Sequence, residues 1–125
     1  MIFDTDILIW LQRGNEKAAR IIDNNEERAI AVQTYMELLQ CAKNKSQHTI
    51  IRSFLKTYGF KILPFSENIG HRAAIYIEEY ALSSGLRVGD AIIAATAVEN
   101  NLMLSTGNTK HFKSINDLQL KAFKP

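Results

Sequence analysis

The sequence predicts an α/β protein built on a mainly parallel sheet. Short runs of β-branched and apolar residues alternate with longer stretches whose apolar residues recur every three or four positions, a pattern typical of strands joined by crossover helices. The chain has 125 residues and only two prolines, and no repeated or proline-rich segment marks a boundary within it. We therefore expect one domain spanning residues 1–125.

Turn and capping residues set the boundaries of the first elements. Gly14 ends the first helix, and Asn15 has the side chain of a good cap for the second. In the third helix Val32, Met36 and Leu39 recur at helical spacing, so we expect them on its buried face. The expected order is a strand over residues 1–4, helices over 5–12 and 15–27, a strand over 28–32 and a helix starting at 34.

The second half of the chain continues the alternation. Gly59 is expected to end a helix, Ser66 to begin a long one and Gly85 to follow its end. A later helix opened by Gly89 and Asp90 is apolar nearly all round, so it should be buried on most of its faces. The expected order is a helix over 46–58, a strand over 60–65, helices over 66–83 and 89–100, and strands over 102–105 and 118–123.

Cysteine content and hydropathy limit the function classes. Cys41 is the only cysteine, which excludes an internal disulfide and a thiolate-based zinc site within one chain. No apolar run approaches the roughly 20 residues that cross a bilayer. No basic leader precedes the first apolar stretch, so we expect no membrane partner and a cytoplasmic location.

The net charge of +2 is too small to indicate nucleic-acid binding, but the charges are distributed unevenly. No acidic residue occurs between Glu37 and Glu67, and the basic residues of that stretch are Lys43, Lys45, Arg52, Lys56 and Lys61. Such a run is more often a solvated helix surface than a phosphate-binding one. It is therefore weak evidence for a surface that contacts RNA.

Asp4 directly follows the first expected strand. In open α/β sheets ligands bind beyond the carboxyl ends of the strands, so this carboxylate lies where a site is expected. The competing interpretation is structural: Asp4 or Thr5 caps the next helix, while Asp6 interacts with the positive end of the helix dipole. From this segment alone the structural interpretation is the more common one.

Asp90 and Glu37 are further candidates. Asp90 stands at the start of a buried helix, where it is either an N-cap worth about 1 kcal/mol or a rigidly held ligand. Glu37 lies away from the expected apolar stripe, as a solvated glutamate would. If Asp4, Glu37 and Asp90 converge, their mutual repulsion raises their pKa values unless a divalent cation is bound, and Mg2+ and Mn2+ prefer such oxygen ligands. No zinc-protease spacing joins His48, His71 and His111, so we assign none of them a catalytic role.

Three segments together resemble the acidic motifs of PIN domains: FDTDILIW at 3–10, TYMELL at 34–39 and GDAIIAATA at 89–97. A fourth, LSTGNTKHF at 104–112, is similar to the late strand-and-loop motif of that family. The resemblance implies a three-layer α/β/α sandwich with a central parallel sheet. It also implies a pocket in which Asp4, Glu37 and Asp90 bind Mg2+ or Mn2+ and hydrolyse RNA, with Thr106 and Asn108 at the rim orienting water or phosphate.

PIN proteins of this length resemble the VapC-like toxins of type II toxin–antitoxin modules. That resemblance implies a homodimeric ribonuclease acting on structured RNA such as tRNA. It also implies a small antitoxin that covers the acidic pocket with a basic side chain and fills the apolar grooves between the early helices. The chain departs from the family at Asn108, where a fourth acid is common, at His111 and at Asp6. These departures favour one ordered metal ion over two, with Asp6 either supplying the missing charge or capping the helix.

Two other hypotheses remain. An Asp-Thr-Asp sequence after an apolar strand is also similar to haloacid-dehalogenase-like phosphatases, in which Asp4 would be the nucleophile. The similarity fails at Leu8, where those enzymes have Thr or Val, and over Ile92–Ala95, which lacks their further acid. The third hypothesis is an inactive PIN-fold binding module, supported by Asn108. Retention of three mutually repelling carboxylates argues against it.

Overall fold

The structure, a computed structural model, describes residues 1–125 and contains one five-stranded sheet. The strands lie in the order β3-β2-β1-β4-β5, and every neighbouring pair is parallel. Strand order therefore reverses between β1 and β4, where ligands of open parallel sheets bind. The strands are β1 (Ile2–Phe3), β2 (Ala29–Ala31), β3 (Lys61–Leu63), β4 (Leu104–Thr106) and β5 (Leu120–Ala122).

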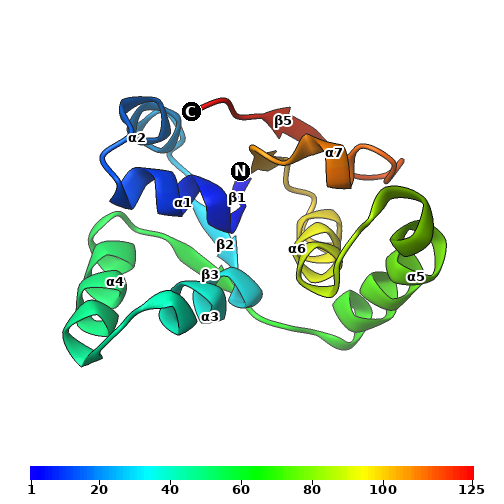
Figure 1. Ribbon diagram of the computed structural model, residues 1–125, viewed down its shortest axis with the longest axis horizontal. Helices are drawn as coiled ribbons and strands as arrows, with labels where there is room; N and C mark the ends of the chain where they lie inside the picture. The colour runs from blue at the N-terminus through cyan, green and yellow to red at the C-terminus, as the bar shows by residue number, and fades with distance from the viewer.

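Helices cover both faces of this sheet, which confirms the predicted α/β/α sandwich (Figure 1). Consecutive strand residues point to opposite faces, so Ile2 and Phe3 belong to different hydrophobic clusters. Phe3 packs with the side of α1 to α4, and Ile2 with that of α5 and α6. The helices are α1 (Thr5–Gln12), α2 (Glu16–Asp23), α3 (Val32–Cys41), α4 (Lys45–Thr57), α5 (Glu67–Ser84), α6 (Val88–Glu99) and α7 (Thr109–Phe112).

Local capping chemistry accounts for several boundaries. Asn15 accepts a hydrogen bond from the backbone N–H of Ala18 at 2.9 Å and begins α2. Ser66 accepts one from the backbone N–H of Ile69 at 3.2 Å and begins α5. Gly85 ends α5 in the left-handed conformation at φ 72°, which costs glycine little. These boundaries, and the burial of α6, were correctly predicted. No helix combines the length and the apolarity that spanning a membrane requires.

One prediction about local structure was wrong, and one short helix was not predicted. Helix α3 begins at Val32, directly after β2, and its buried residues are Thr34 and Leu38, whereas Met36 is 50% exposed. The direction in which the chain leaves β2 decides which face meets the sheet, and an apolar stripe does not carry that information. Helix α7 was not predicted because it has only four residues. It is anchored by Phe112, which is fully buried.

Candidate active site

A cleft of about 460 Å3 lies at the carboxyl ends of β1 and β4, where the strand order reverses. Residues from four segments line it: the start of α1, the middle of α3, the start of α6 and the turn after β4. The lining residues are Asp4, Thr5, Asp6, Ile9, Glu37, Asp90, Ile93, Gly107 and Asn108. The four predicted residues Asp4, Glu37, Asp90 and Asn108 are therefore brought together at one site.

Both interpretations of Asp4 that the sequence left open apply, because its side chain caps α1 and also lines the cleft. Its Oδ1 accepts a hydrogen bond from the backbone N–H of Thr5 at 2.8 Å, and its Oδ2 accepts one from Thr106 Oγ1 at 2.7 Å. The residue is only 7% exposed. Burial, and next the charge of Asp6, raise the pKa of Asp4 to about 7 despite these two hydrogen bonds.

Thr106 lies beneath the cleft. It is fully buried and does not line the cavity, so its predicted place at the rim was wrong. Its hydroxyl donates to Asp4 and accepts a hydrogen bond from the backbone N–H of Asn108 at 3.0 Å. One side chain therefore fixes both the carboxylate after β1 and the turn after β4.

Glu37 is half-buried and reaches the cleft from α3. Its Oε1 accepts a hydrogen bond from Thr5 Oγ1 at 2.7 Å, and the Thr5 hydroxyl lies 3.2 Å from that of Thr34. The interpretation of Glu37 as a solvated glutamate was wrong because the side of α3 that meets the sheet carries Thr34 rather than Met36. Thr5 therefore holds the Glu37 carboxylate. This contact joins α1 and α3, so no local motif in the sequence reveals it.

Asp90 is the third residue of α6, and the N-cap is Arg87, so the N-cap interpretation of Asp90 was wrong. Its Oδ2 lies 3.4 Å from the backbone N–H of Arg87 and 3.3 Å from His111 Nδ1. The same Nδ1 lies 2.8 Å from Asn108 Nδ2. A protonated Nδ1 donates to Asp90, whereas an unprotonated Nδ1 accepts from Asn108. Sequence spacing gave no sign that His111 would lie against two residues of the site.

Asp6 supplies a fourth carboxylate to the cleft. Its Oδ2 accepts a hydrogen bond from the backbone N–H of Gly107 at 2.9 Å, and its buried Oδ1 has no partner. Burial is the main cause that raises the pKa of Asp6, and the N–H groups of Gly107 and Ile7 oppose it. A Cβ on Gly107 would lie 2.6 Å from Asp6 Oδ2, so only glycine fits this contact without a shift.

The donor chemistry of the cleft fits a divalent cation. Four carboxylates line it and no lysine or arginine does, so their charge is not balanced by a basic lining residue. The raised pKa values of Asp4 and Asp6 reflect burial and this repulsion. Mg2+ and Mn2+ prefer oxygen ligands of this kind. In the structure, no group of three or more acidic, histidine or cysteine side chains is already arranged so that it could hold a metal ion.

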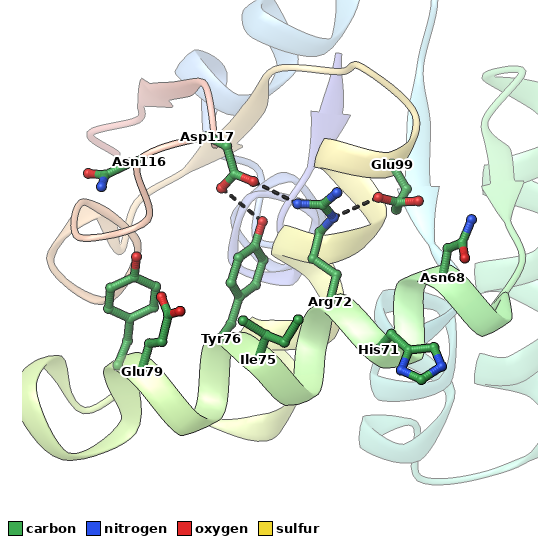
Figure 2. Close-up of a pocket in the computed structure, with 10 residues that line it drawn as sticks. Asn68, His71, Arg72, Ile75, Tyr76, Glu79, Glu99, Asn116 and Asp117 are labelled. Carbon is green, nitrogen blue, oxygen red and sulfur yellow. Dashed lines mark hydrogen bonds and ion pairs between the residues drawn. The ribbon is translucent and has the colours of Figure 1, made fainter.

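A separate cavity of about 540 Å3 lies on α5, near the opposite end of α6 from Asp90 (Figure 2). Arg72 extends from α5 between Glu99 Oε2, at 2.6 Å, and Asp117 Oδ2, at 2.7 Å. The Tyr76 hydroxyl also donates to Asp117, at 3.0 Å. The guanidinium is thus already paired with two carboxylates, and the cluster ties α5 and α6 to the segment before β5.

The fold and the acidic cleft together define a class of protein, the PIN domains, and the chain belongs to that family. The PIN domain family model matches residues 1–118. Among relatives, a ribonuclease VapC from Rickettsia bellii is 30% identical, over 96% of this chain and 93% of its own length. This membership separates the chain from the haloacid-dehalogenase-like phosphatases considered above.

Solved structures agree with the family assignment. A chain of a toxin–antitoxin complex from Klebsiella pneumoniae is 36% identical, with a TM-score of 0.80 over 94% of this chain and 93% of its own. A chain of VapBC-1 from nontypeable Haemophilus influenzae is 26% identical, with a TM-score of 0.77 over 98% of each chain. The resemblance to this family inferred from four sequence segments is therefore confirmed across nearly the whole chain.

Proposed function

We propose that this chain is an Mg2+- or Mn2+-dependent endoribonuclease, the toxin of a toxin–antitoxin pair, acting in the cytoplasm on structured RNA such as tRNA. The observation that carries the proposal is the single cleft lined by Asp4, Glu37, Asp90 and Asn108 in a PIN chain. Its 30% identity to a ribonuclease VapC over almost the full length supports the choice of RNA.

In this proposal Asp4, Glu37 and Asp90 hold the cation. When bound, the cation supplies an activated water for attack on the phosphodiester and stabilises the charge that develops there. Thr106 keeps Asp4 in one orientation through the 2.7 Å hydrogen bond, and Thr5 does the same for Glu37. Asn108 lines the cleft, and its amide would orient water or phosphate. Because Asn108 carries no charge, and Asp6 Oδ2 is already held by the backbone N–H of Gly107, we propose one ion rather than two.

The experiment that tests the function is incubation of purified, antitoxin-free protein with end-labelled total RNA in Mg2+, in Mn2+ and in EDTA. Discrete products that need the cation support the ribonuclease, and sequencing their ends identifies the substrate and the bond cut. A folded protein that binds Mn2+ but leaves every RNA intact contradicts it. That outcome favours an inactive binding module. Asn108, which stands where a fourth acid is common in the family, would then explain the lost activity.

The antitoxin in this proposal binds an apolar groove of about 530 Å3 between α1, α3 and α4, in which nine of eleven lining residues are hydrophobic. Ile9 lines both this groove and the acidic cleft, so a peptide in the groove reaches the carboxylates. A basic side chain at that point would neutralise them. Ile50 lines the groove and is well exposed, so Ile50→Asp should prevent co-purification with the cognate antitoxin when the two are co-expressed. Unchanged co-purification contradicts this docking site.

The expected homodimer belongs to the same proposal. Ile75 and Leu82 are exposed on α5 and lie two helical turns apart, on one side of the helix. Exposed apolar side chains that share a helix face are typical of an interface between subunits. Light scattering should give a dimer for the wild type and a monomer for an Ile75→Ser, Leu82→Ser variant. A wild-type monomer contradicts the proposed dimer.

A further inference from the structure

A second hollow next to the cleft has the opposite charge. It measures about 350 Å3, lies between α2 and the end of β5, and we call it the basic groove. Four basic residues, all exposed, surround it, and no acidic residue lines it. Its lining residues are Lys17, Arg20, Ile21, Asn24, Asn25, Lys121, Ala122, Phe123 and Lys124.

None of these four basic side chains forms an ion pair within the protein. The ion pairs of the structure involve only His71, Arg72 and His111 as basic partners. Lys17 and Arg20 project from α2, and Lys121 and Lys124 come from the other end of the chain. Clustering unpaired cations costs repulsion, and an anionic ligand relieves it.

The basic groove adjoins the acidic cleft through the end of β5. Phe123 lines the groove, and its backbone N–H donates to the carbonyl of Thr106 at 2.8 Å. Its own carbonyl oxygen is 3.4 Å from where a Cβ on Gly107 would lie, and Gly107 lines the cleft. In Figure 1 the C-terminal end accordingly lies beside α2.

The negative charge of the cleft means that RNA binding depends on a basic surface nearby. Its lining carries four carboxylates and no lysine or arginine, so the cleft by itself repels a polyanionic substrate. Affinity for the backbone beyond the phosphate at the bound cation must then come from basic residues beside the cleft. The basic residues of α4 are less well placed, because the apolar groove lies between α4 and the cleft.

We propose that the basic groove binds the phosphate backbone of the substrate RNA next to the bond that is cut. The inference rests on the proposed ribonuclease function and adds where the substrate lies. Lysine contributes point charges, and Arg20 can hold one phosphate through two hydrogen bonds. Contacts of this kind position the strand without reading its bases, so the groove supplies affinity and direction but not sequence preference.

The test compares two variants that lose the same charge. The groove variant carries Lys17→Gln, Arg20→Gln, Lys121→Gln and Lys124→Gln; the comparison variant carries Lys43→Gln, Lys45→Gln, Arg52→Gln and Lys56→Gln on and before α4. All eight side chains are exposed, and circular dichroism checks that both variants fold. Binding of labelled tRNA is measured in EDTA over a range of salt concentrations. Steady-state cleavage of the same tRNA is measured with Mn2+.

The groove variant should lose at least about tenfold in affinity at low salt, and its salt slope should fall by about three. Its KM should rise while kcat changes little, because backbone binding is lost equally from ground state and transition state. The comparison variant should show clearly smaller changes in affinity, salt slope and KM.

Equal losses in the two variants would overturn the inference, since net charge alone would explain them. Wild-type behaviour of the groove variant, or a greater loss in the comparison variant, would also overturn it while leaving the ribonuclease intact. Loss of antitoxin binding with RNA affinity unchanged would assign the groove to the protein partner and overturn it too. A wild-type protein that neither binds nor cuts RNA would instead contradict the proposed function.

Discussion

Thr106 at the end of β4 donates a 2.7 Å hydrogen bond to Asp4 at the end of β1, joining residues 102 positions apart in the sequence. The two strands are neighbours in the sheet, and the bond crosses the point where the strand order reverses. The same hydroxyl accepts the backbone N–H of Asn108. A fully buried threonine thus controls the orientation of a carboxylate and of a turn that both belong to the cleft.

Replacing Thr106 by valine keeps the side-chain shape and removes the hydroxyl. The buried Oδ2 of Asp4 and the N–H of Asn108 then lose a partner, so stability should fall by about 1–3 kcal/mol. Mn2+ affinity should also fall, because Asp4 is no longer held in place. Urea unfolding and calorimetry measure the two effects. Thr106→Ser, which keeps the hydroxyl, should restore Mn2+ affinity, and a Thr106→Val protein with wild-type Mn2+ affinity would contradict this positioning role.

Stability in EDTA should fall as pH rises, with Asp4 as a main cause. The pKa of Asp4 is about 7 in the folded protein against 3.8 as its ordinary value. The folded state therefore holds the proton more tightly, and this contribution is complete below about pH 4 and lost as pH rises through about 7. The wild type should lose up to about 4 kcal/mol more than Asp4→Asn over that interval. Urea unfolding at a series of pH values measures it; parallel curves for the two proteins would contradict it.

Mn2+ should stabilise the folded protein. A ligand at about 100 times its dissociation constant contributes roughly 2.7 kcal/mol, which appears as a rise in melting temperature. Asp90→Asn should abolish most of that rise, and titration calorimetry should give one ion per chain. A variant that responds to Mn2+ like the wild type would exclude Asp90 from the ligand set.

Gly107→Ala should destabilise the protein by about 1–3 kcal/mol, because its Cβ would lie 2.6 Å from Asp6 Oδ2. Gly70→Ala is a matched control, since the Cβ there meets only Phe65, at 3.4 Å. Removing the opposing carboxylate by Asp6→Ala should relieve most of the cost. A double-mutant cycle by urea unfolding measures the coupling, and additive effects would show that the two residues do not constrain each other.

Features that depend on short stretches of chain were predicted well. Caps at Asn15 and Ser66 and the left-handed Gly85 are set by neighbouring residues, so the pattern of elements followed from the sequence. The order of strands in the sheet did not, because periodicity contains no information on which strands become neighbours. Resemblance to a family supplied the α/β/α sandwich that local patterns left open.

In the site, too, the sequence did not reveal contacts between distant segments. Asp4, Glu37, Asp90 and Asn108 were singled out by motif and all line the cleft. Local spacing nevertheless misjudged the face of Glu37 and assigned no role to His111, because both depend on contacts between segments far apart in sequence. The family resemblance placed Thr106 at the rim, whereas the sheet buries it beneath Asp4.

The central claim is that this acidic cleft cuts RNA with the help of a divalent cation. The most direct measurement is single-turnover cleavage of labelled tRNA by the wild type and by an Asp4→Asn, Asp90→Asn double variant, purified identically, with Mn2+ and with EDTA. We predict discrete products only for the wild type with Mn2+. Equal cleavage by the double variant, or cleavage that persists in EDTA, would contradict the claim.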